Sequence, residues 1–415
     1  MRALWRAGKY EGGLRATADE RLCGNGDPGR MPRHDPFRLV IAGGGVAALE
    51  ALVALRSVRT RITVTLLCDI ESFSYRSLAT GEAFGLGTPH RYDLAELCED
   101  LDARFVRGCV RAVDADAHVV QTAAGDMLPY DALIVAMGAE AHPAFEHGVT
   151  FDREHTPHEF DEALSDLRAG FAPDVAIVVP PGASWTLPAY ELAFLTAAWG
   201  RREGVGVTLV TPEKSPLAAF GPTASAGVAR LLADERIDLR PGAHAQILSD
   251  TALRAGSTWV EASRIVSLPL LRGLRVVGLP HDGQGFLPVD ELCGVIGCDD
   301  VWAAGDGTAR PVKQGGLAAQ QADLAARAVL HRAGEPTRPE PYRPVLRGLL
   351  RTSTTPHYLR AELDRVAETS QISQQPLWWP PSKIAACWLP SYLARQDASR
   401  ITAPEQPAAT DPIAA

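Results

Sequence analysis

The sequence predicts an α/β fold built from two three-layer units with parallel sheets, followed by a C-terminal cap. Two segments, 38–68 and 175–210, each run from an apolar strand through a turn and a helical stretch to a second apolar strand. This order of strand, helix and strand predicts neighbouring parallel strands. The chain has 415 residues, of which 46% are hydrophobic, which is enough for two or three buried cores.

In the first unit, residues 38–42 form an apolar strand that runs directly into three glycines. Residues 46–57 then show helical spacing of apolar side chains, and residues 62–68 are β-branched and apolar. Further along, residues 119–130 indicate a hairpin and residues 132–137 a buried strand.

The glycine turn fits the dinucleotide fingerprint Gly43-x-Gly45-x-x-Ala48. Gly43 permits the tight turn, Gly45 lets the backbone approach a pyrophosphate, and Ala48 is small enough for close packing of the helix on the sheet. Asp69 lies 24 residues after Gly45 (69 − 45), near the spacing of an acid that binds a ribose hydroxyl. The alternative is a glycine-rich turn that binds no ligand.

A second motif lies far along the chain, where the short strand 301–303 ends in Gly305-Asp306. A long helix rich in alanine and glutamine follows at 316–330. The Asp306 carboxylate is suited to accept hydrogen bonds from a ribityl chain. The helix start near Gly315 is suited to stabilise negative charge at one edge of a flavin.

Together these motifs resemble the two-dinucleotide-domain flavoproteins of the pyridine nucleotide-disulfide oxidoreductase superfamily, and the branch of type II NADH dehydrogenases and sulfide:quinone oxidoreductases in particular. The resemblance covers residues 37–330 and includes Phe73-Ser74-Tyr75-Arg76 and Leu133-Ile134-Val135-Ala136-Met137-Gly138. It implies two Rossmann-like domains, with FAD in an extended pose and its ring system between them. It also implies that the backbone at Val110 approaches the adenine.

These observations define the expected cofactor site. The predicted FAD-binding residues are Gly43, Gly45, Val46, Ala47, Ala48, Asp69, Arg76, Val110, Ala136, Met137, Gly138, Gly305, Asp306 and Gly315. Lys313 and Glu191 are the candidate catalytic residues, Lys313 through charge near the flavin and Glu191 through a position facing its nicotinamide side. Their alternatives are a solvated loop lysine and a plain first-turn helix acid. No metal site is predicted.

The second unit departs from the family at its nucleotide turn, residues 180–188. One glycine stands where three are usual, three prolines remove N–H donors, and Trp185 adds bulk. Glu213, just after the next strand, could hold a ribose and favour NADH over NADPH, or could be a solvated loop acid. The site is therefore expected to bind NAD(P)H weakly.

The redox cysteines of disulfide reductases are missing from their usual place. Cys293 and Cys298 have the right spacing but precede the Gly-Asp strand, so we interpret them as structural thiols. The odd count of seven cysteines indicates reduced thiols and a cytoplasmic protein. No apolar run reaches the length of a membrane span, so membrane association is not expected.

The expected domain organisation has five parts. They are a disordered extension at 1–36, an FAD domain made of 37–150 and 266–335, an inserted NAD(P)-like domain at 151–265, a cap at 336–400 and a disordered tail at 401–415. The aromatic and proline-rich cap is expected to cover the flavin face or to form a homodimer interface. The alternative is an interfacial membrane anchor.

The leading functional hypothesis is an FAD-dependent oxidoreductase that passes electrons from NAD(P)H to a quinone-like or small organic acceptor. A second is a flavoenzyme with a degenerate nicotinamide site, of the oxidase or sulfur-donor type. A third is a flavin-binding interaction protein without turnover. The net charge of -9 argues against nucleic acid as a partner.

Overall fold

The computed structural model describes residues 36–56, 61–75, 79–87, 90–152, 157–352 and 355–402. The predicted terminal extensions lie outside these residues, apart from residue 36 and the end of the last helix, which reaches Thr402.

The first sheet is parallel and has five strands in the order β20-β9-β1-β2-β5. Its strands are β1 (Phe37–Ala42), β2 (Ile62–Cys68), β5 (Ala103–Arg107), β9 (Ala132–Val135) and β20 (Val301–Ala303). The chain runs from central β1 to β2 on one side, and β9 lies on the other side, so the strand order reverses beside β1. Ligands of open parallel sheets bind at such a reversal, outside the carboxyl ends of the strands.

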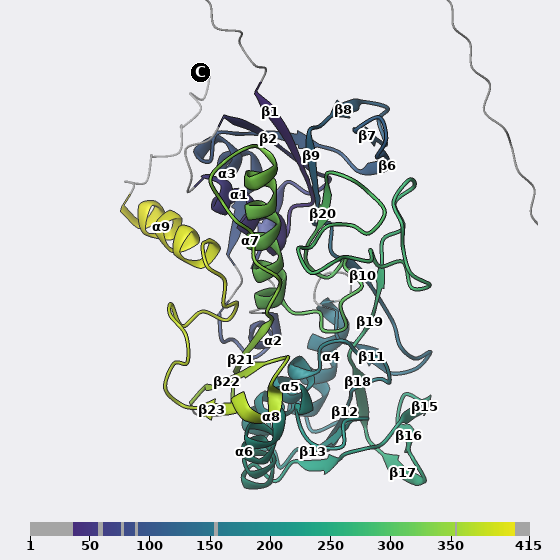
Figure 1. Ribbon diagram of the computed structural model, residues 1–415. Coiled ribbons are helices and arrows are strands. Elements are labelled where there is room, and N and C mark those ends of the chain that lie inside the picture. Colours follow the sequence, from purple (N-terminus) through teal and green to yellow (C-terminus); the bar gives the residue numbers. More distant parts are fainter. Residues whose placement is uncertain are drawn as a thin grey trace, which may run out of the picture. The chain divides into compact units, whose positions relative to one another are not determined.

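Two helices pack side by side on one face of this sheet, α1 (Val46–Arg56) and α7 (Gly315–Arg332), as Figure 1 shows. The helix predicted from residue 46 begins there because an apolar stretch with helical spacing follows directly after the glycine turn. An antiparallel sheet of β6 (Val110–Asp114), β7 (Val119–Thr122) and β8 (Met127–Pro129) contributes to the core on the opposite face. The unit therefore has three layers.

The second sheet is also parallel, in the order β11-β18-β12-β13-β14. Its strands are β11 (Val149–Thr150), β12 (Asp174–Val178), β13 (Gly206–Val210), β14 (Asp238–Arg240) and β18 (Arg264–Ser267). One core joins it to α4 (Pro157–Arg168), α5 (Leu187–Trp199) and α6 (Gly221–Asp234). A second core joins it to β15 (Ala245–Ser249), β16 (Ala252–Ala255) and β17 (Thr258–Glu261). Two parallel three-layer units confirm the predicted fold class.

The C-terminal region forms an antiparallel sheet that the sequence did not predict. Its strands are β21 (Val345–Leu350), β22 (His357–Glu362) and β23 (Gln371–Ser373), and the helices α8 (Val366–Thr369) and α9 (Leu389–Thr402) belong to the same region. The sheet packs on the second unit: a Cβ added to Gly348 of β21 would lie 2.6 Å from the Phe220 ring and 2.7 Å from Leu187.

The remaining elements are short. They are β3 (Ser72–Ser74), α2 (Ala79–Glu82), β4 (Arg91–Asp93), α3 (Leu94–Asp100), β10 (Ala139–His142), a 3-10 turn at Ala218–Phe220 and β19 (Leu270–Gly273). Among them, α3 contributes to the core of the first unit, while β3 pairs with β4 and β10 with β19. Residues 285–290, which lead toward β20, make only isolated bridges at Leu287 and Val289.

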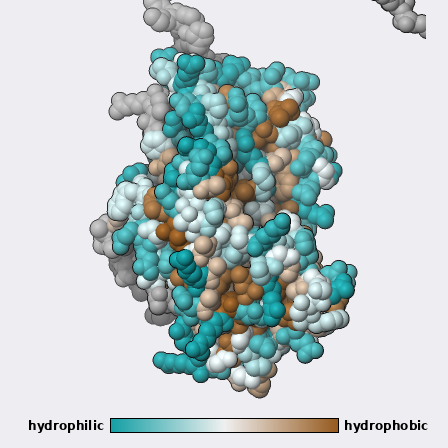
Figure 2. All heavy atoms as spheres, turned by 60° about the horizontal axis from the view of Figure 1, so that its bottom comes forward, coloured by the Kyte–Doolittle hydropathy of each residue, from teal (hydrophilic) through white to brown (hydrophobic). Residues whose placement is uncertain are grey.

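The described surface is mixed in polarity. On the face brought forward in Figure 2, hydrophobic residues form several groups separated by hydrophilic ones. Within the described ranges, no helix combines the length and the apolar character that a membrane span requires.

Candidate functional site

The turn between β1 and α1 accepts only glycine at residue 43. The φ angle of Gly43 is 126°, and its N–H donates to the Leu67 carbonyl at 2.8 Å. A Cβ placed there would lie 2.5 Å from the carbonyl carbon of Ala136 and 3.0 Å from the Met137 nitrogen. The turn therefore brings the start of α1 against the end of β9.

Gly45 differs from Gly43 because nothing occupies the space in front of it. A Cβ added to Gly45 would meet no described atom within 4 Å, although its carbonyl already accepts the Leu49 N–H at 3.0 Å in the first turn of α1. The helix then continues with Val46, Ala47 and the fully buried Ala48. The start of α1 thus faces open space suited to an anionic group such as a pyrophosphate.

The distant Gly-Asp motif meets this turn in the fold. A Cβ on Gly305 would lie 3.2 Å from the Cβ of Ala47, and one on Gly307 would lie 2.9 Å from the Gly138 carbonyl oxygen. Asp306 stands between these two contact points. Three of the predicted cofactor segments therefore lie together at the carboxyl ends of β1, β9 and β20.

A fourth part of the predicted site lies at the end of β2. Asp69 is exposed, and the Cys109 thiol donates to its carboxylate at 3.5 Å, which places Asp69 beside Val110, the first residue of β6. The residues assigned to the ribose and to the adenine are therefore neighbours. Arg76, also predicted to bind the cofactor, lies outside the described residues.

Lys313 is a buried cation and not a solvated loop residue. Its side chain is 5% exposed, its ammonium donates to the Thr308 carbonyl, and it lies 3.8 Å from the centroid of the Phe286 ring. Burial lowers the pKa of Lys313 to about 8, against the opposing influence of Asp306 and Asp282. Lys313 therefore loses its positive charge as the pH rises through about 8.

The start of α7 is covered by the C-terminal segment. A Cβ on Gly315 would lie 2.9 Å from Ile384, so this segment crosses directly over the first turn of α7. Gln314 caps the helix by accepting the Leu317 N–H at 2.9 Å, and its side-chain amide donates to the Arg347 carbonyl at 3.2 Å. The α7 terminus is thus tied to β21.

A buried carboxylate on α1 holds the same C-terminal segment. Glu50 is fully buried and accepts the backbone N–H groups of Cys387, Trp388 and Leu389 at 2.8, 3.0 and 2.7 Å. These groups lie at the beginning of α9, so Glu50 satisfies helix donors that would otherwise be unpaired. Sequence reasoning missed Glu50, whose only signal is an acid inside an otherwise apolar helix.

Glu191, the second candidate catalytic residue, is completely buried on α5. Its carboxylate accepts from the Lys383 ammonium at 2.5 Å, from the Thr80 hydroxyl at 2.5 Å and from the backbone N–H of Arg351 at 3.1 Å. Burial lowers the pKa of Lys383, and the ion pair with Glu191 opposes that effect. The carboxylate therefore joins α2, α5 and the C-terminal region.

In the second unit, protein side chains pack around the turn at 180–188. The Trp185 ring lies 5.9 Å from the Phe220 ring, centroid to centroid, and β21 presses on Phe220 from another side. The backbone N–H of Lys313 donates to the Ser184 carbonyl at 3.3 Å. The turn is thus packed against Phe220 and bonded to the loop that precedes α7, whereas Gly182 at its tip is exposed.

Glu213 is likewise engaged within the protein. One carboxylate oxygen accepts from the Tyr190 hydroxyl at 2.8 Å and the Thr211 hydroxyl at 3.3 Å, and the other accepts the Ala218 N–H at 3.1 Å. Burial raises the pKa of Glu213. Both oxygens that a ribose would need already have partners, so Glu213 is not a solvated loop acid.

The two cysteines with redox-like spacing have the surroundings of structural thiols. Cys293 is fully buried, and burial raises its pKa to about 12. Cys298 is partly buried, and burial also raises its pKa. Neither forms a disulfide within the described residues.

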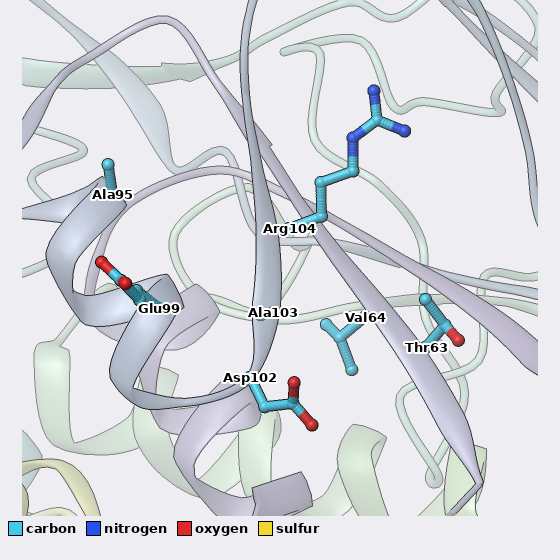
Figure 3. A pocket seen from close by; sticks show the side chains of 7 residues that line it. All are labelled: Thr63, Val64, Ala95, Glu99, Asp102, Ala103 and Arg104. Carbon is cyan, nitrogen blue, oxygen red and sulfur yellow. The ribbon is translucent and has the colours of Figure 1, made fainter.

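One hollow on the surface lies apart from this site. It is formed by β2, β5 and α3, as Figure 3 shows, and is lined by Thr63, Val64, Ala95, Glu99, Asp102, Ala103 and Arg104. None of the predicted cofactor residues lines it, so we assign it no role.

Comparison with known proteins agrees with this arrangement. The chain is 27% identical over 189 residues to the sulfide-quinone reductase of Aquifex aeolicus (strain VF5), covering 42% of this chain and 43% of that protein. It is 30% identical over 185 residues to the rhodocoxin reductase of Rhodococcus erythropolis, covering 43% and 42%. The matched regions therefore span less than half of these curated relatives.

The fold is shared over a longer stretch. The X-ray structure of the sulfide:quinone oxidoreductase from Aquifex aeolicus matches with a TM-score of 0.73 at 20% identity, covering 81% of this chain and 87% of that one. The family model described as pyridine nucleotide-disulphide oxidoreductase matches residues 37–329. The chain therefore belongs to the pyridine nucleotide-disulphide oxidoreductase family, whose members are flavin-dependent oxidoreductases.

Proposed function

We propose that this protein is an FAD-dependent oxidoreductase that passes electrons from a reduced donor to a quinone-like or small organic acceptor. The supporting observation is the meeting of the α1 turn, the end of β9 and the Gly305-Asp306 motif around the open space in front of Gly45. FAD would supply the redox chemistry, taking up electrons from the donor and releasing them to the acceptor. The FAD domain would comprise 37–150 and 266–335, with a NAD(P)-like domain at 151–265 between its two parts.

The residues of this chain would bind and orient the cofactor. The first N–H groups of α1 would hold the pyrophosphate, Asp69 a ribose, and Asp306 the ribityl chain. The start of α7 and the Lys313 ammonium would place positive charge beside the flavin ring. Glu191 would act as a positioning residue that holds Lys383 and the C-terminal segment in place.

A second candidate function has its own support. In it, the electron donor is not a nicotinamide nucleotide bound in the second unit. The engaged carboxylate of Glu213 and the aromatic packing of Trp185 and Phe220 favour this version. Family membership favours NAD(P)H, so the two versions differ in the donor and agree on the cofactor.

The assignment of FAD is tested at Asp306. Replacing Asp306 with alanine should weaken FAD binding about ten- to hundredfold, because hydrogen bonds to a charged group contribute about 1.5–3 kcal/mol. The measurement is the dissociation constant of FAD by fluorescence quenching after removal and re-addition of the cofactor. The exposed turn residue Asp116, changed to alanine, is the matched control and should bind FAD like the wild type. Equal affinity in both variants would disprove the role of Asp306.

The role of Lys313 is tested by the midpoint potential of the bound flavin. Replacing Lys313 with methionine should lower the potential by about 30 mV or more, since 30 mV corresponds to about 1.4 kcal/mol for a two-electron couple. The lysine is charged below its pKa of about 8 and neutral above it, so the difference should shrink as the pH rises through that value. A potential difference that is absent, or independent of pH, would show that Lys313 does not act on the flavin.

A further inference from the structure

We propose that Phe286 is a positioning residue for the redox reaction, whose ring face holds the Lys313 ammonium in its charged form beside the flavin. This inference rests on the proposed function, because it explains how a buried lysine keeps the charge that the flavin would need. The Lys313 Nζ atom lies 3.8 Å from the centroid of the Phe286 ring. Phe286 would therefore act on the flavin through Lys313.

The attraction of the ring face matters here because the contact is buried. Lys313 and Phe286 are each only 5% exposed. Burial favours the neutral amine of Lys313, whereas the carboxylates of Asp306 and Asp282 favour the charged form. An aromatic face carries partial negative charge and attracts a cation most strongly where water is excluded. The ring of Phe286 therefore opposes the effect of burial on the pKa of Lys313.

The backbone around Phe286 fixes the position of the ring. The Phe286 N–H donates to the Asp282 carboxylate at 2.9 Å, and the Phe286 carbonyl accepts the Asp282 N–H at 2.8 Å. The N–H of the next residue, Leu287, donates to the Gly307 carbonyl at 2.9 Å. Phe286 is thus attached to the same loop that carries Asp306, and its ring does not depend on its own packing alone for its place.

The lysine is held at both ends of its side chain. Its backbone N–H donates to the Ser184 carbonyl at 3.3 Å, and its ammonium donates to the Thr308 carbonyl. An ammonium has three N–H donors, of which Thr308 takes one and the Phe286 ring occupies the direction of another. The third is left for the cofactor. A cation fixed in this way stabilises developing negative charge without having to reorganise.

The first test measures the pKa of Lys313 directly by NMR of isotope-labelled lysine. The chain has only four lysines, Lys9, Lys214, Lys313 and Lys383, so single variants suffice to identify each signal. Phe286→Leu should lower the pKa of Lys313 by about one unit, the size expected for a cation over a ring in a desolvated site. The same pKa in the wild type and in Phe286→Leu would overturn the proposal.

The matched control is Phe160→Leu. Phe160 is 2% exposed and packs against the rings of Phe84 and Phe151 in the second unit, so this change also removes a buried ring from a core. It should leave the pKa of Lys313 unchanged. An equal shift in both leucine variants would show that general loosening of the core is responsible, and would count against Phe286.

Fluorination of the ring separates the charge of its face from its volume. A phenylalanine with one, two or three ring fluorine atoms nearly keeps its size, while its face progressively loses negative charge. Introduced at residue 286, these rings should lower the pKa of Lys313 stepwise with each added fluorine. A pKa that is the same across this series would mean that the ring acts by packing alone, and the proposal would be wrong.

The consequence for the flavin is measured as its midpoint potential against pH. Lys313 is charged in both the wild type and Phe286→Leu at low pH and neutral in both at high pH, so their potentials should agree at both extremes. Between the lowered pKa of the variant and the value of about 8 in the wild type, only the wild type keeps the charge, and the variant should have the lower potential. A difference that does not vary with pH, or no difference, would overturn the positioning role.

Flavin content separates this inference from the proposed function. Bound FAD is measured by visible absorbance in every protein before the potentials are determined. A wild type without flavin refutes the proposed function, whereas a flavin-loaded wild type whose Lys313 pKa does not respond to residue 286 refutes this inference alone. If Phe286→Leu loses its flavin, the potentials are compared between the wild type and the fluorinated rings, which keep the volume of Phe286.

Discussion

Replacing Gly45 with valine should give a folded protein that purifies without FAD. Apart from its neighbours in the chain, no described atom lies within 4 Å of the position of a Cβ at Gly45, so the new side chain begins in open space. It would instead fill the space in front of α1, where a pyrophosphate must approach the backbone N–H groups. Valine is a poorer N-cap than glycine, which costs about 1 kcal/mol of stability and leaves the fold intact.

The measurement is the molar ratio of flavin to protein, together with the melting temperature. Gly283→Val is the matched control, since Gly283 is exposed and its Cβ position is equally open. Gly43→Val supplies the contrast, because its Cβ would collide with Ala136 and its φ is positive, so this variant should lose stability itself. A Gly45→Val protein with a full complement of FAD would refute the site described above.

The first unit could be predicted because its signals are local. The turn at Gly43 and the apolar pattern after it determine that α1 begins at Val46, where the structure has it. The meeting of the α1 turn with the end of β9 and with Gly305 then follows from parallel pairing, which gathers the carboxyl ends of strands at one edge. The motifs in the sequence and the topology of the sheet therefore predict the same neighbouring segments.

The C-terminal contribution could not be predicted, since its contacts join residues far apart in the sequence. Lys383 and Glu191, whose side chains form a buried ion pair, are separated by 192 residues. A helix acid such as Glu191 gives no local indication of its partner, and the sequence alone left its role open between a residue facing the flavin and a plain first-turn helix acid. In β21 the burial alternates along the strand, but the sequence does not show it, because two of the three partly exposed positions are the apolar residues Val345 and Leu349.

The contacts of the second unit were also only partly predictable from the sequence. The proline-rich turn at 180–188 indicated a weakened nucleotide site from its composition alone. That Glu213 is bonded to Tyr190, and that β21 presses on Phe220, depends on packing between distant elements. A nucleotide bound at this turn would have to displace these contacts of Glu213 and Phe220.

NADH should therefore reduce the bound flavin slowly, with NADPH no better and without a tight complex with NAD. A nicotinamide donor needs its pyrophosphate held by backbone N–H groups at the start of α5 and its ribose held by an acid after β13. Three of the nine positions in the turn at 180–188 are prolines, which have no N–H. Glu213, the acid after β13, already accepts from Tyr190 and Ala218.

The experiment is anaerobic stopped-flow, following the loss of the oxidised flavin band against nucleotide concentration. The expected rate rises in proportion to NADH without saturating up to about 1 mM, the upper end of ordinary KM values. Tyr190→Phe removes the shorter of the two hydroxyl hydrogen bonds to one oxygen of Glu213 and leaves the fold of α5 in place. It should increase the rate with NADH more than with NADPH, since a carboxylate that is more available to a ribose repels a 2′-phosphate. Fast reduction that saturates at micromolar NADH would show that the turn binds the nucleotide despite its prolines. No reduction by either nucleotide, in a protein that dithionite still bleaches, would leave a donor outside the second unit as the remaining source of electrons.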